Sequence, residues 1–242
     1  MEMAKEVKMK NWKGTRALIT GGTSGLGFEL ARQLSALGAD VAVVARSAKS
    51  LKSVSETYPK IHTIEGDVSK KDRIYPVLGE ANQKLGGVDI LFNNASSLGP
   101  TPLRILSDTD CEDFETALQT NLLGPFRLTK GVLAQMRLNG GGTIVNISSD
   151  AAVSAYPKWG VYGASKAALD HLTRIWQSEY PEKEIRFFAV DPGDMKTPLH
   201  FSAVPDANPS DLRDPKDSAR MIIEDLSVKL DQRSGETRWR LK

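Results

Sequence analysis

Three polar residues in the second half of the chain have the chemistry to move a proton. Tyr162 and Lys166 stand four positions apart in "VYGASKAAL", and Ser149 ends the run "GGTIVNISS". A free tyrosine has a pKa of about 10, and a nearby ammonium lowers it, which makes proton transfer at neutral pH easier. Residues at i and i+4 share a helix face whatever their purpose. The surrounding elements must therefore decide between an active site and an ordinary helix surface.

The elements that would position these residues alternate between strand and helix. Short β-branched runs occur at residues 16–20, 40–45, 60–68, 88–95, 141–149, 184–193 and 236–241, with helical segments between them. This order is typical of βα units wound into a parallel sheet. It predicts a single α/β domain over residues 13–242, doubly wound (Rossmann-type), with about seven parallel strands and helices on both faces. Residues 1–12 are expected to be a mobile N-terminal extension.

A glycine-rich turn, "TGGTSGLG", follows the first expected strand and leads into a helix. Glycine lets the backbone turn sharply and approach a ligand closely, and the free N–H groups of a helix N-terminus favour a diphosphate. No Lys-Ser or Lys-Thr follows the glycines, so a nucleoside triphosphate loop is disfavoured. The turn predicts dinucleotide binding by Gly21, Thr23, Ser24, Gly25, Leu26 and Gly27.

The end of the second strand indicates which dinucleotide is bound. An acidic residue there would hold the adenosine ribose 2′-hydroxyl, whereas a cation would pair with a 2′-phosphate. The strand ends in "VVARS", with Ala45 at the expected place of the acid and Arg46 and Ser47 after it. A guanidinium grips phosphate bidentately, which favours NADP(H). The alternative is that Arg46 is only a solvated residue at a strand end.

Two segments depart from the regular alternation. Residues 110–136 form one long helical segment, which the Gly124-Pro125 pair is expected to bend. Residues 194–215 contain Pro198, Pro205, Pro209 and Pro215 among few periodic apolar positions. We interpret this segment as a long loop on the substrate side, since such loops are often lids, with a solvated surface excursion as the alternative.

Composition excludes several other classes of protein. A net charge of +2 is too small to indicate a nucleic acid or an anionic membrane as partner. Cys111 is the only cysteine, and the three histidines share no ligand spacing, so we expect no disulfide and no metal site. No apolar stretch approaches a membrane span. We expect a cytoplasmic protein.

Taken together, the motifs resemble the short-chain dehydrogenase/reductase family. "TGGTSGLG", the "NNA" of residues 93–95, Asn121, "NISS", "YGASK" and "DPGDMKT" occur in that family's order between Thr20 and Thr197. The resemblance implies that Tyr162 is the acid or base, that Lys166 lowers its pKa and holds the nicotinamide ribose, and that Ser149 donates to the substrate carbonyl. Asn121 would hold a water that links the lysine to solvent.

The resemblance also assigns cofactor contacts outside the glycine turn. Each has a simpler alternative: Asp67 as a turn residue or helix cap, Asn94 as a turn residue, and Pro192 with Gly193 as a strand-terminating turn. The additional contacts expected are Asp67, Val68, Asn94, Ala95, Tyr162, Lys166, Pro192, Gly193, Met195 and Thr197. Tyr156, Trp159, Met195 and Leu199 are expected around an apolar or aromatic-tolerant substrate pocket.

The sequence thus predicts an NADPH-dependent oxidoreductase that acts on a small-molecule carbonyl or secondary alcohol. An NAD-dependent dehydrogenase of the same family and a non-catalytic cofactor-binding scaffold remain as alternatives. Two features differ from the family pattern. Ser96 replaces a usual glycine, and the chain stops at "GETRWRLK" without a longer tail. A homo-oligomer, dimer or tetramer, is expected, although the short tail puts four-fold assembly in doubt.

Overall fold

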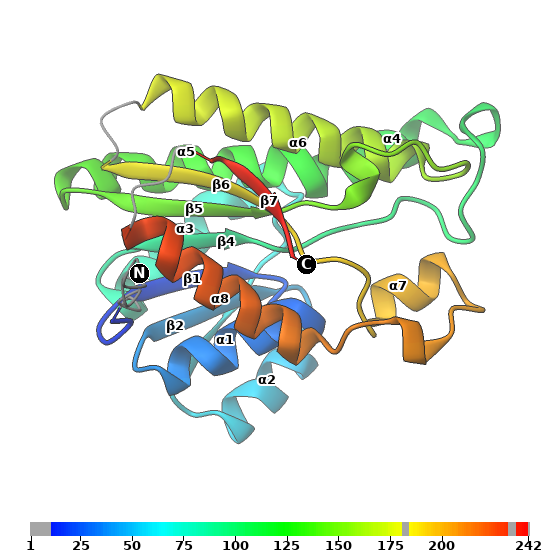
Figure 1. The fold of residues 1–242 in the computed structure, drawn as a ribbon. Coiled ribbons are helices and arrows are strands. Elements are labelled where there is room, and N and C mark those ends of the chain that lie inside the picture. Colours follow the sequence, from blue (N-terminus) through cyan, green and yellow to red (C-terminus); the bar gives the residue numbers. More distant parts are fainter. Residues whose placement is uncertain (1–10, 181–183, 232–235, 242) are drawn as a thin grey trace, which may run out of the picture.

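The structure is a computed structural model, and it describes residues 11–180, 184–231 and 236–241. Within these residues, seven parallel strands form one sheet in the order β3-β2-β1-β4-β5-β6-β7 (Figure 1). The strands are β1 (Arg16–Thr20), β2 (Asp40–Ala45), β3 (Ile61–Glu65), β4 (Ile90–Asn93), β5 (Gly142–Ile147), β6 (Ile185–Asp191) and β7 (Arg238–Arg240). The predicted doubly wound parallel sheet is confirmed.

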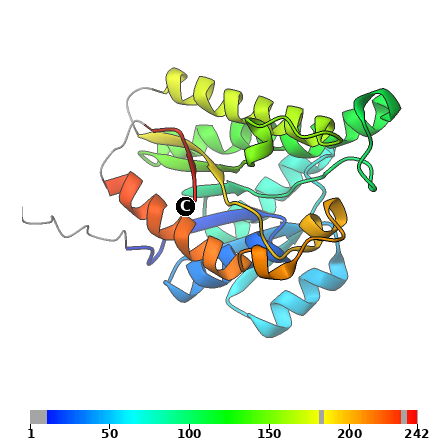
Figure 2. The same cartoon turned by 45° about the vertical axis from the view of Figure 1, so that its right-hand side comes forward.

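Helices cover both faces of the sheet, as the two views in Figures 1 and 2 show. The α-helices are α1 (Gly25–Ala36), α2 (Ala48–Thr57), α3 (Lys71–Leu85), α4 (Cys111–Leu118), α5 (Gly124–Leu138), α6 (Gly160–Glu179), α7 (Pro198–Ala203) and α8 (Pro215–Asp231). Short 3-10 turns occupy η1 (Leu106–Asp108), η3 (Asp150–Ala152) and η4 (Pro209–Asp211), and a π-helical turn occupies η2 (Gln119–Leu123).

Two hydrophobic cores lie on opposite faces because successive strand residues point to opposite sides. In β1, Ala17 and Ile19 join the core under α1 and α8, whereas Leu18 joins the core under α3 and α5. Trp12 is buried in the first core. The packed chain therefore includes Trp12, which corrects the expectation that residues 1–12 are a mobile extension; residues 1–10 lie outside the described residues.

The order of the strands places a crevice at one edge of the sheet. β2 and β3 lie on one side of β1, and β4 to β7 lie on the other. Helices that leave neighbouring strands toward opposite faces open a crevice at the carboxyl ends of the strands, where ligands bind in such sheets. At β1 and β4 this crevice is bordered by the glycine turn and by Asn94.

The helical segment predicted over residues 110–136 is interrupted. It consists of α4, the π-helical turn η2 and α5, so the irregularity begins before Gly124. A side chain at Gly124 would place its Cβ 2.7 Å from the carbonyl oxygen of Val68, so this position packs directly against the loop after β3.

The proline-rich segment 194–215 is more ordered than expected. It contains α7 and η4, and Thr197 caps α7 by accepting from the His200 N–H at 3.2 Å. Its two ends are joined, because the Lys196 N–H donates to Arg213 and the Arg213 N–H donates to Asp194. The loop interpretation was therefore wrong for residues 198–203, which extend beyond the carboxyl ends of the strands as a helix (Figures 1 and 2).

Candidate active site

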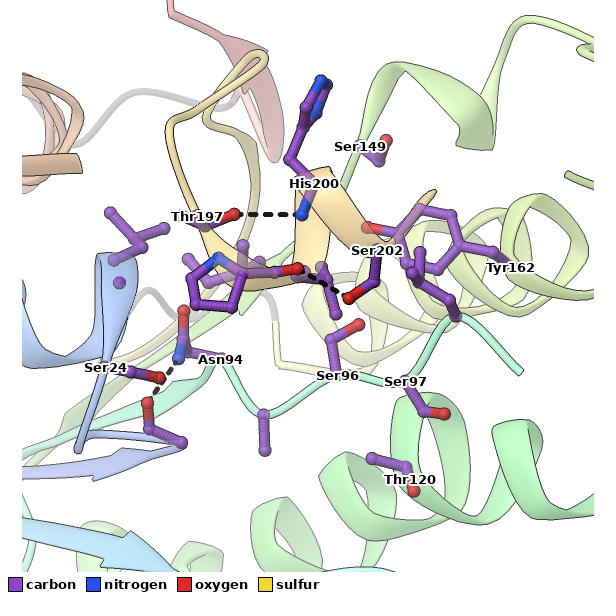
Figure 3. A pocket seen from close by; sticks show the side chains of 18 of the residues that line it. Ser24, Asn94, Ser96, Ser97, Thr120, Ser149, Tyr162, Thr197, His200 and Ser202 are labelled. Carbon is purple, nitrogen blue, oxygen red and sulfur yellow. Dashed lines mark hydrogen bonds between the residues drawn. The ribbon is translucent and has the colours of Figure 1, made fainter. Parts of the chain in front are cut away.

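A cleft of about 980 Å³ opens at the carboxyl ends of the strands. It is lined by every residue predicted for catalysis or cofactor binding except Gly27 and Asn121, which are buried. Figure 3 shows Tyr162 and Ser149 on one side of this cleft, Ser24 and Asn94 on the other, and α7 with His200 and Ser202 between them. The fold thus brings together predicted residues from seven separate segments of the chain.

The glycine turn is held against β4 by a set of short contacts. The Asn94 amide donates to the carbonyl oxygens of Thr20 at 2.9 Å and Gly21 at 3.2 Å. A Cβ at Gly27 would lie 2.4 Å from both the Asn94 amide nitrogen and the Gly21 carbonyl oxygen, so only glycine fits there. Asn94 therefore bridges two strands rather than forming an Asx-type turn.

The N-terminus of α1 opens into the cleft. Gly21 and Gly25 have φ angles of +65° and +51°, a region in which glycine is favoured. The N-cap residue Ser24 makes no side-chain capping bond, and Ser24, Gly25 and Leu26 all line the cleft. Uncapped N–H groups at a helix N-terminus suit an anion, so this cradle fits the diphosphate of a dinucleotide.

Cationic side chains gather at the β2 end of the cleft. Arg46 lines it with an exposed side chain, and so does Lys70, which the sequence reasoning missed. Ser47 accepts from the Ser50 N–H at 3.2 Å and so caps α2. Asp67 accepts from the Ser69 N–H at 2.9 Å, so it forms a local turn while it lines the cleft.

Tyr162 and Lys166 project from one face of α6 into the cleft, and both are buried. The lysine Nζ donates to the carbonyl oxygen of Ile147 at 2.7 Å, which fixes it against the end of β5. The same nitrogen lies 5.5 Å from the centroid of the Tyr162 ring. The side chain of Trp159, one turn earlier in the chain, meets that ring edge to face at 5.7 Å.

Burial dominates the electrostatics of this pair. It raises the pKa of Tyr162 to about 12, although the hydroxyls of Ser149 and Ser96 act in the opposite direction. Burial also lowers the pKa of Lys166 to about 8, and the negative charge of Asp170 opposes this shift. The net shift of Tyr162 is upward because removing the phenolate from water costs more free energy than the two serine hydroxyls offset. The expected lowering of the Tyr162 pKa by Lys166 stays a prediction.

Ser149 closes the cleft at the end of β5. Its hydroxyl donates to Asp150 at 3.1 Å and accepts from the Ala151 N–H at 3.2 Å. The other oxygen of Asp150 accepts from the Tyr156 hydroxyl at 2.9 Å. Ser148 has a buried hydroxyl with no hydrogen-bond partner among the described residues, and its N–H donates to Val190.

Asn121 lies in the π-helical turn and is fully buried. Its amide donates to the Ser97 carbonyl at 2.7 Å and to the Ser165 hydroxyl at 2.8 Å, and its oxygen accepts from the Ser97 N–H at 2.8 Å. The side chain thus ties the loop after β4 to α6. The water-holding role stays a prediction, because these amide bonds all go to protein groups.

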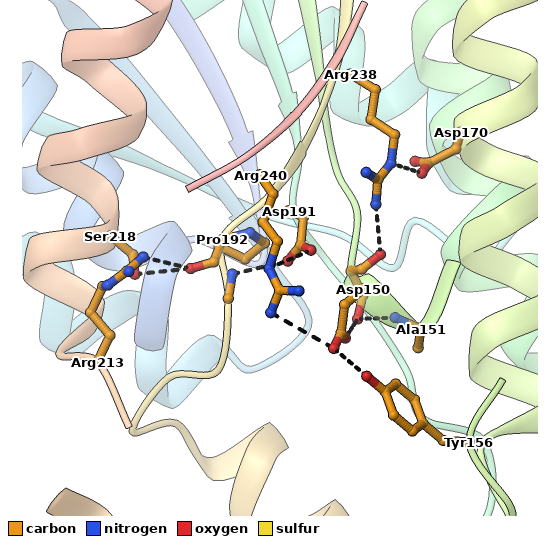
Figure 4. A network of polar contacts seen from close by, with 12 residues as sticks. Asp150, Ala151, Tyr156, Asp170, Asp191, Pro192, Arg213, Ser218, Arg238 and Arg240 are labelled. Carbon is orange, nitrogen blue, oxygen red and sulfur yellow. Dashed lines mark hydrogen bonds and ion pairs between the residues drawn. The ribbon is translucent and has the colours of Figure 1, made fainter. Parts of the chain in front are cut away.

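The substrate side of the cleft contains the four residues expected there. Tyr156, Trp159, Met195 and Leu199 all line it. Several lining residues were not foreseen, because no motif marks them and only the fold brings them here: Ser97, Leu98, Thr116, Thr120, Asp150, His200, Ser202, Ala203 and Val204. Pro192 and Gly193 stand at the end of β6, and Arg213 and Ser218 both donate to the Pro192 carbonyl (Figure 4).

In the parts of the chain that the structure describes, no group of three or more His, Cys, Asp or Glu side chains is arranged to hold a metal ion. No helix in those same parts combines the length and the apolar character that a membrane crossing needs.

Comparison with known proteins identifies the family of this chain. A family model described as short chain dehydrogenase matches residues 15–208. The 2-(R)-hydroxypropyl-CoM dehydrogenase of Xanthobacter autotrophicus is 32% identical over 188 residues, which cover 76% of this chain and 75% of that protein.

Solved structures share the fold over nearly the whole chain. The 3-ketoacyl-(acyl-carrier-protein) reductase of Brucella melitensis, complexed with NADH, has a TM-score of 0.84 and 25% identity over 95% of this chain and 97% of its own. A short chain dehydrogenase of Shigella flexneri, complexed with NADP, has a TM-score of 0.85 and covers 96% of this chain and 98% of its own. Its 23% identity is evidence for the fold alone.

Proposed function

Because the chain belongs to the short chain dehydrogenase family of oxidoreductases, we propose that it is an NADPH-dependent carbonyl reductase, or the equivalent secondary alcohol dehydrogenase. The observation that carries this proposal is the convergence of Ser149, Tyr162 and Lys166 on one cleft. The glycine cradle at α1 lines the same cleft and fits a dinucleotide diphosphate. The substrate is a small molecule with a carbonyl or hydroxyl group, and the protein works in the cytoplasm as a homo-oligomer.

The preference for NADP(H) is supported by charge at the end of β2. Ala45 stands where an acid would hold a ribose 2′-hydroxyl, and Arg46 and Lys70 place two cations along the same part of the cleft. A 2′-phosphate would offset both charges, and a guanidinium can bind it bidentately. The solved relatives include complexes with NADP and with NADH, so the choice rests on these residues.

The proposed chemistry is proton donation to a carbonyl oxygen as its carbon is reduced. A bound nicotinamide supplies the hydride. Tyr162, with a pKa of about 12, is protonated at neutral pH and can deliver its proton to the developing alkoxide. Ser149 lies beside the phenol and can donate to the same oxygen once its hydroxyl turns from Asp150. Such donors stabilise charge that develops only in the transition state.

Lys166 has two roles in this proposal. Its ammonium is anchored on the Ile147 carbonyl, so it is positioned to hold the nicotinamide ribose. Its charge beside the ring of Tyr162 also stabilises the phenolate that remains after proton transfer. A scaffold protein without turnover would need the cradle but not this combination of hydroxyls and ammonium.

The test is to mix the protein with NADPH or NADH and a panel of ketones and aldehydes, and to follow the absorbance of the reduced cofactor. We expect turnover with NADPH, and Tyr162→Phe should abolish it while NADPH still binds. Tight cofactor binding without turnover on any carbonyl would favour the scaffold alternative. Activity retained in Tyr162→Phe would reject the assignment of the acid.

A further inference from the structure

The last strand, β7, presents a "RWR" sequence whose side chains alternate between two environments. Trp239 is buried in the core against Phe188, with ring centroids 5.6 Å apart, and the Lys229 ammonium lies 4.9 Å from the Trp239 ring. Arg238 and Arg240 point the other way, toward the loop after β5 (Figure 4). Pairing of β7 with β6 and burial of Trp239 therefore fix where both guanidinium groups lie.

Arg238 contacts both elements that carry the candidate catalytic residues. Its Nε lies 2.6 Å from Asp170 Oδ2 on α6, and its Nη2 donates to the Ser149 carbonyl oxygen at 3.1 Å. Asp170 follows Lys166 by one helical turn. One planar guanidinium thus spans the Ser149 loop and the helix of Tyr162 and Lys166, whose mutual placement decides where the reacting oxygen can sit.

The environment of Asp170 shows that this contact is its charge partner. The carboxylate is buried, and its Oδ1 has no hydrogen bond among the described residues. Burying a carboxylate is costly unless a cation pairs with it, and Arg suits such a pair because its donors form a rigid fork. The Ser149 carbonyl also accepts from the Ala152 N–H at 3.2 Å.

We propose that Arg238 is a positioning residue of the active site, which holds the Ser149 loop in register with the Tyr162–Lys166 face of α6. The inference rests on the proposed function. Arg238 lies outside the lining of the cleft, so it acts through Ser149 and Asp170 and does not touch substrate or cofactor.

Arg238 also belongs to the charge environment of Lys166. The negative charge of Asp170 raises the pKa of Lys166, against the larger effect of burial. Arg238 balances that charge, so its removal leaves the attraction between Asp170 and the ammonium uncompensated. Tyr162 also faces the Lys166 ammonium, and the charges that act on Tyr162 are those of Asp150 in η3 and Asp191 on β6. Arg240 on β7 forms ion pairs with both of these carboxylates, and Arg238 also lowers the pKa of Asp191.

The test is a double-mutant cycle between Arg238→Met and Ser149→Ala, with NADPH-dependent turnover as one readout. Methionine keeps the length of the side chain and removes the charge and the donors. We expect kcat to fall about 10- to 100-fold in Arg238→Met, since small displacements of a catalytic group cost this much. NADPH affinity should change less than about twofold. In the Ser149→Ala background, Arg238→Met should lower kcat by less than about threefold.

Two further variants separate positioning from general stability. Arg238→Lys keeps the ion pair with Asp170 but lacks the fork that also reaches the Ser149 carbonyl, so it should restore the pKa of Lys166 while kcat stays low. Arg220→Met removes an exposed arginine whose ion pairs lie on α8, and it should leave both properties unchanged. If Arg238→Met does not fold, the double-mutant cycle is measured with Arg238→Lys and Ser149→Ala instead.

A second readout is the pKa of Lys166, measured by NMR on lysine-labelled protein. It should rise in Arg238→Met and return in Arg238→Lys. Equal losses of kcat in both Ser149 backgrounds, or no loss at all, would overturn the inference. Failure of the unaltered protein to turn over any carbonyl would count against the proposed function instead. The NMR titration of Lys166 would then be the deciding measurement, and an unchanged pKa of Lys166 in Arg238→Met would reject the role of Arg238.

Discussion

The hydroxyl of Ser149 donates to the carboxylate of Asp150, 3.1 Å away, so Asp150 competes with a substrate oxygen for the proton of Ser149. The same carboxylate helps to raise the pKa of Tyr162 through its negative charge. Asp150 therefore works against both groups that are proposed to donate to the substrate oxygen. Replacing Asp150 should therefore change how readily Ser149 and Tyr162 donate their protons while both side chains stay in place.

We predict that Asp150→Asn and Asp150→Ala both lower the pKa of Tyr162, because each removes the charge. The alkaline limb of the kcat profile for carbonyl reduction should move to lower pH by a fraction of a unit. Only alanine also removes the acceptor of the Ser149 hydroxyl, so it should have the higher kcat of the two by up to about fivefold, the worth of one hydrogen bond. The exposed Asp217→Asn on α8 is the control, and an unmoved alkaline limb in both Asp150 variants would contradict the electrostatic argument.

Arg46→Ala should discriminate between the two nicotinamide cofactors. Loss of a charge-assisted contact to a 2′-phosphate costs about 1.5–3 kcal/mol, so NADPH affinity should fall about 10- to 100-fold while NADH affinity stays within about twofold. Fluorescence titration of both cofactors measures this directly. Lys52→Ala, which removes an exposed cation from α2, should have no effect on either, and equal loss of both cofactors in Arg46→Ala would remove the phosphate assignment.

Gly27→Ala tests the cradle. The added Cβ would lie 2.4 Å from the Gly21 carbonyl oxygen and from the Asn94 amide, and one of these is backbone that cannot rotate away. We expect a loss of about 1–3 kcal/mol in the free energy of unfolding and at least about tenfold weaker NADPH binding. Gly79→Ala on α3 is the matched control, because nothing lies within 4 Å of its added Cβ. Urea denaturation should leave that variant neutral or slightly more stable.

The sheet was predictable because each of its strands is marked locally. A run such as residues 187–190 is apolar on both faces, since helices cover both, and Pro192 and Gly193 form the turn shortly after it. The site was predictable to the extent that motifs mark it. Tyr162 and Lys166 were assigned by the order of the motifs around them, and Gly21 to Gly27 by their position after a strand.

The remaining features depend on contacts between distant segments. Helix α7 starts at a proline and was missed, because its apolar residues have no clear period and the segment that carries it is held by backbone bonds between Lys196 and Arg213. The π-helical turn at Asn121 depends on bonds to Ser97 and Ser165. The rise in the pKa of Tyr162 was not foreseen, because the spacing of Lys166 is visible in the sequence, whereas the degree of burial is not.

Burial of Lys166 makes a prediction about stability against pH. The pKa of this lysine is about 8 in the folded protein and about 10.5 when unperturbed. Between these values the unfolded chain binds more protons than the folded one, so the free energy of unfolding should rise with pH in this window. Below about pH 8 the lysine is charged in both states, and the full cost of burying it is present.

Lys166→Met should remove this dependence. From pH 7.5 to 9.5, the free energy of unfolding of the unaltered protein should rise by about 2 kcal/mol relative to that of the variant, because the slope is about 1.4 kcal/mol per pH unit. Urea denaturation at each pH measures both values. Comparison of the two proteins cancels the titration of all other groups. The window stops below pH 10 because above it the phenol of Tyr162 loses its proton in the unfolded chain before it does so in the folded protein, which lowers the free energy of unfolding. Parallel stability curves for the two proteins would mean that Lys166 does not lose its proton near pH 8 in the folded state. The lysine would then hold the ribose and face Tyr162 as a full cation throughout the working range of the enzyme.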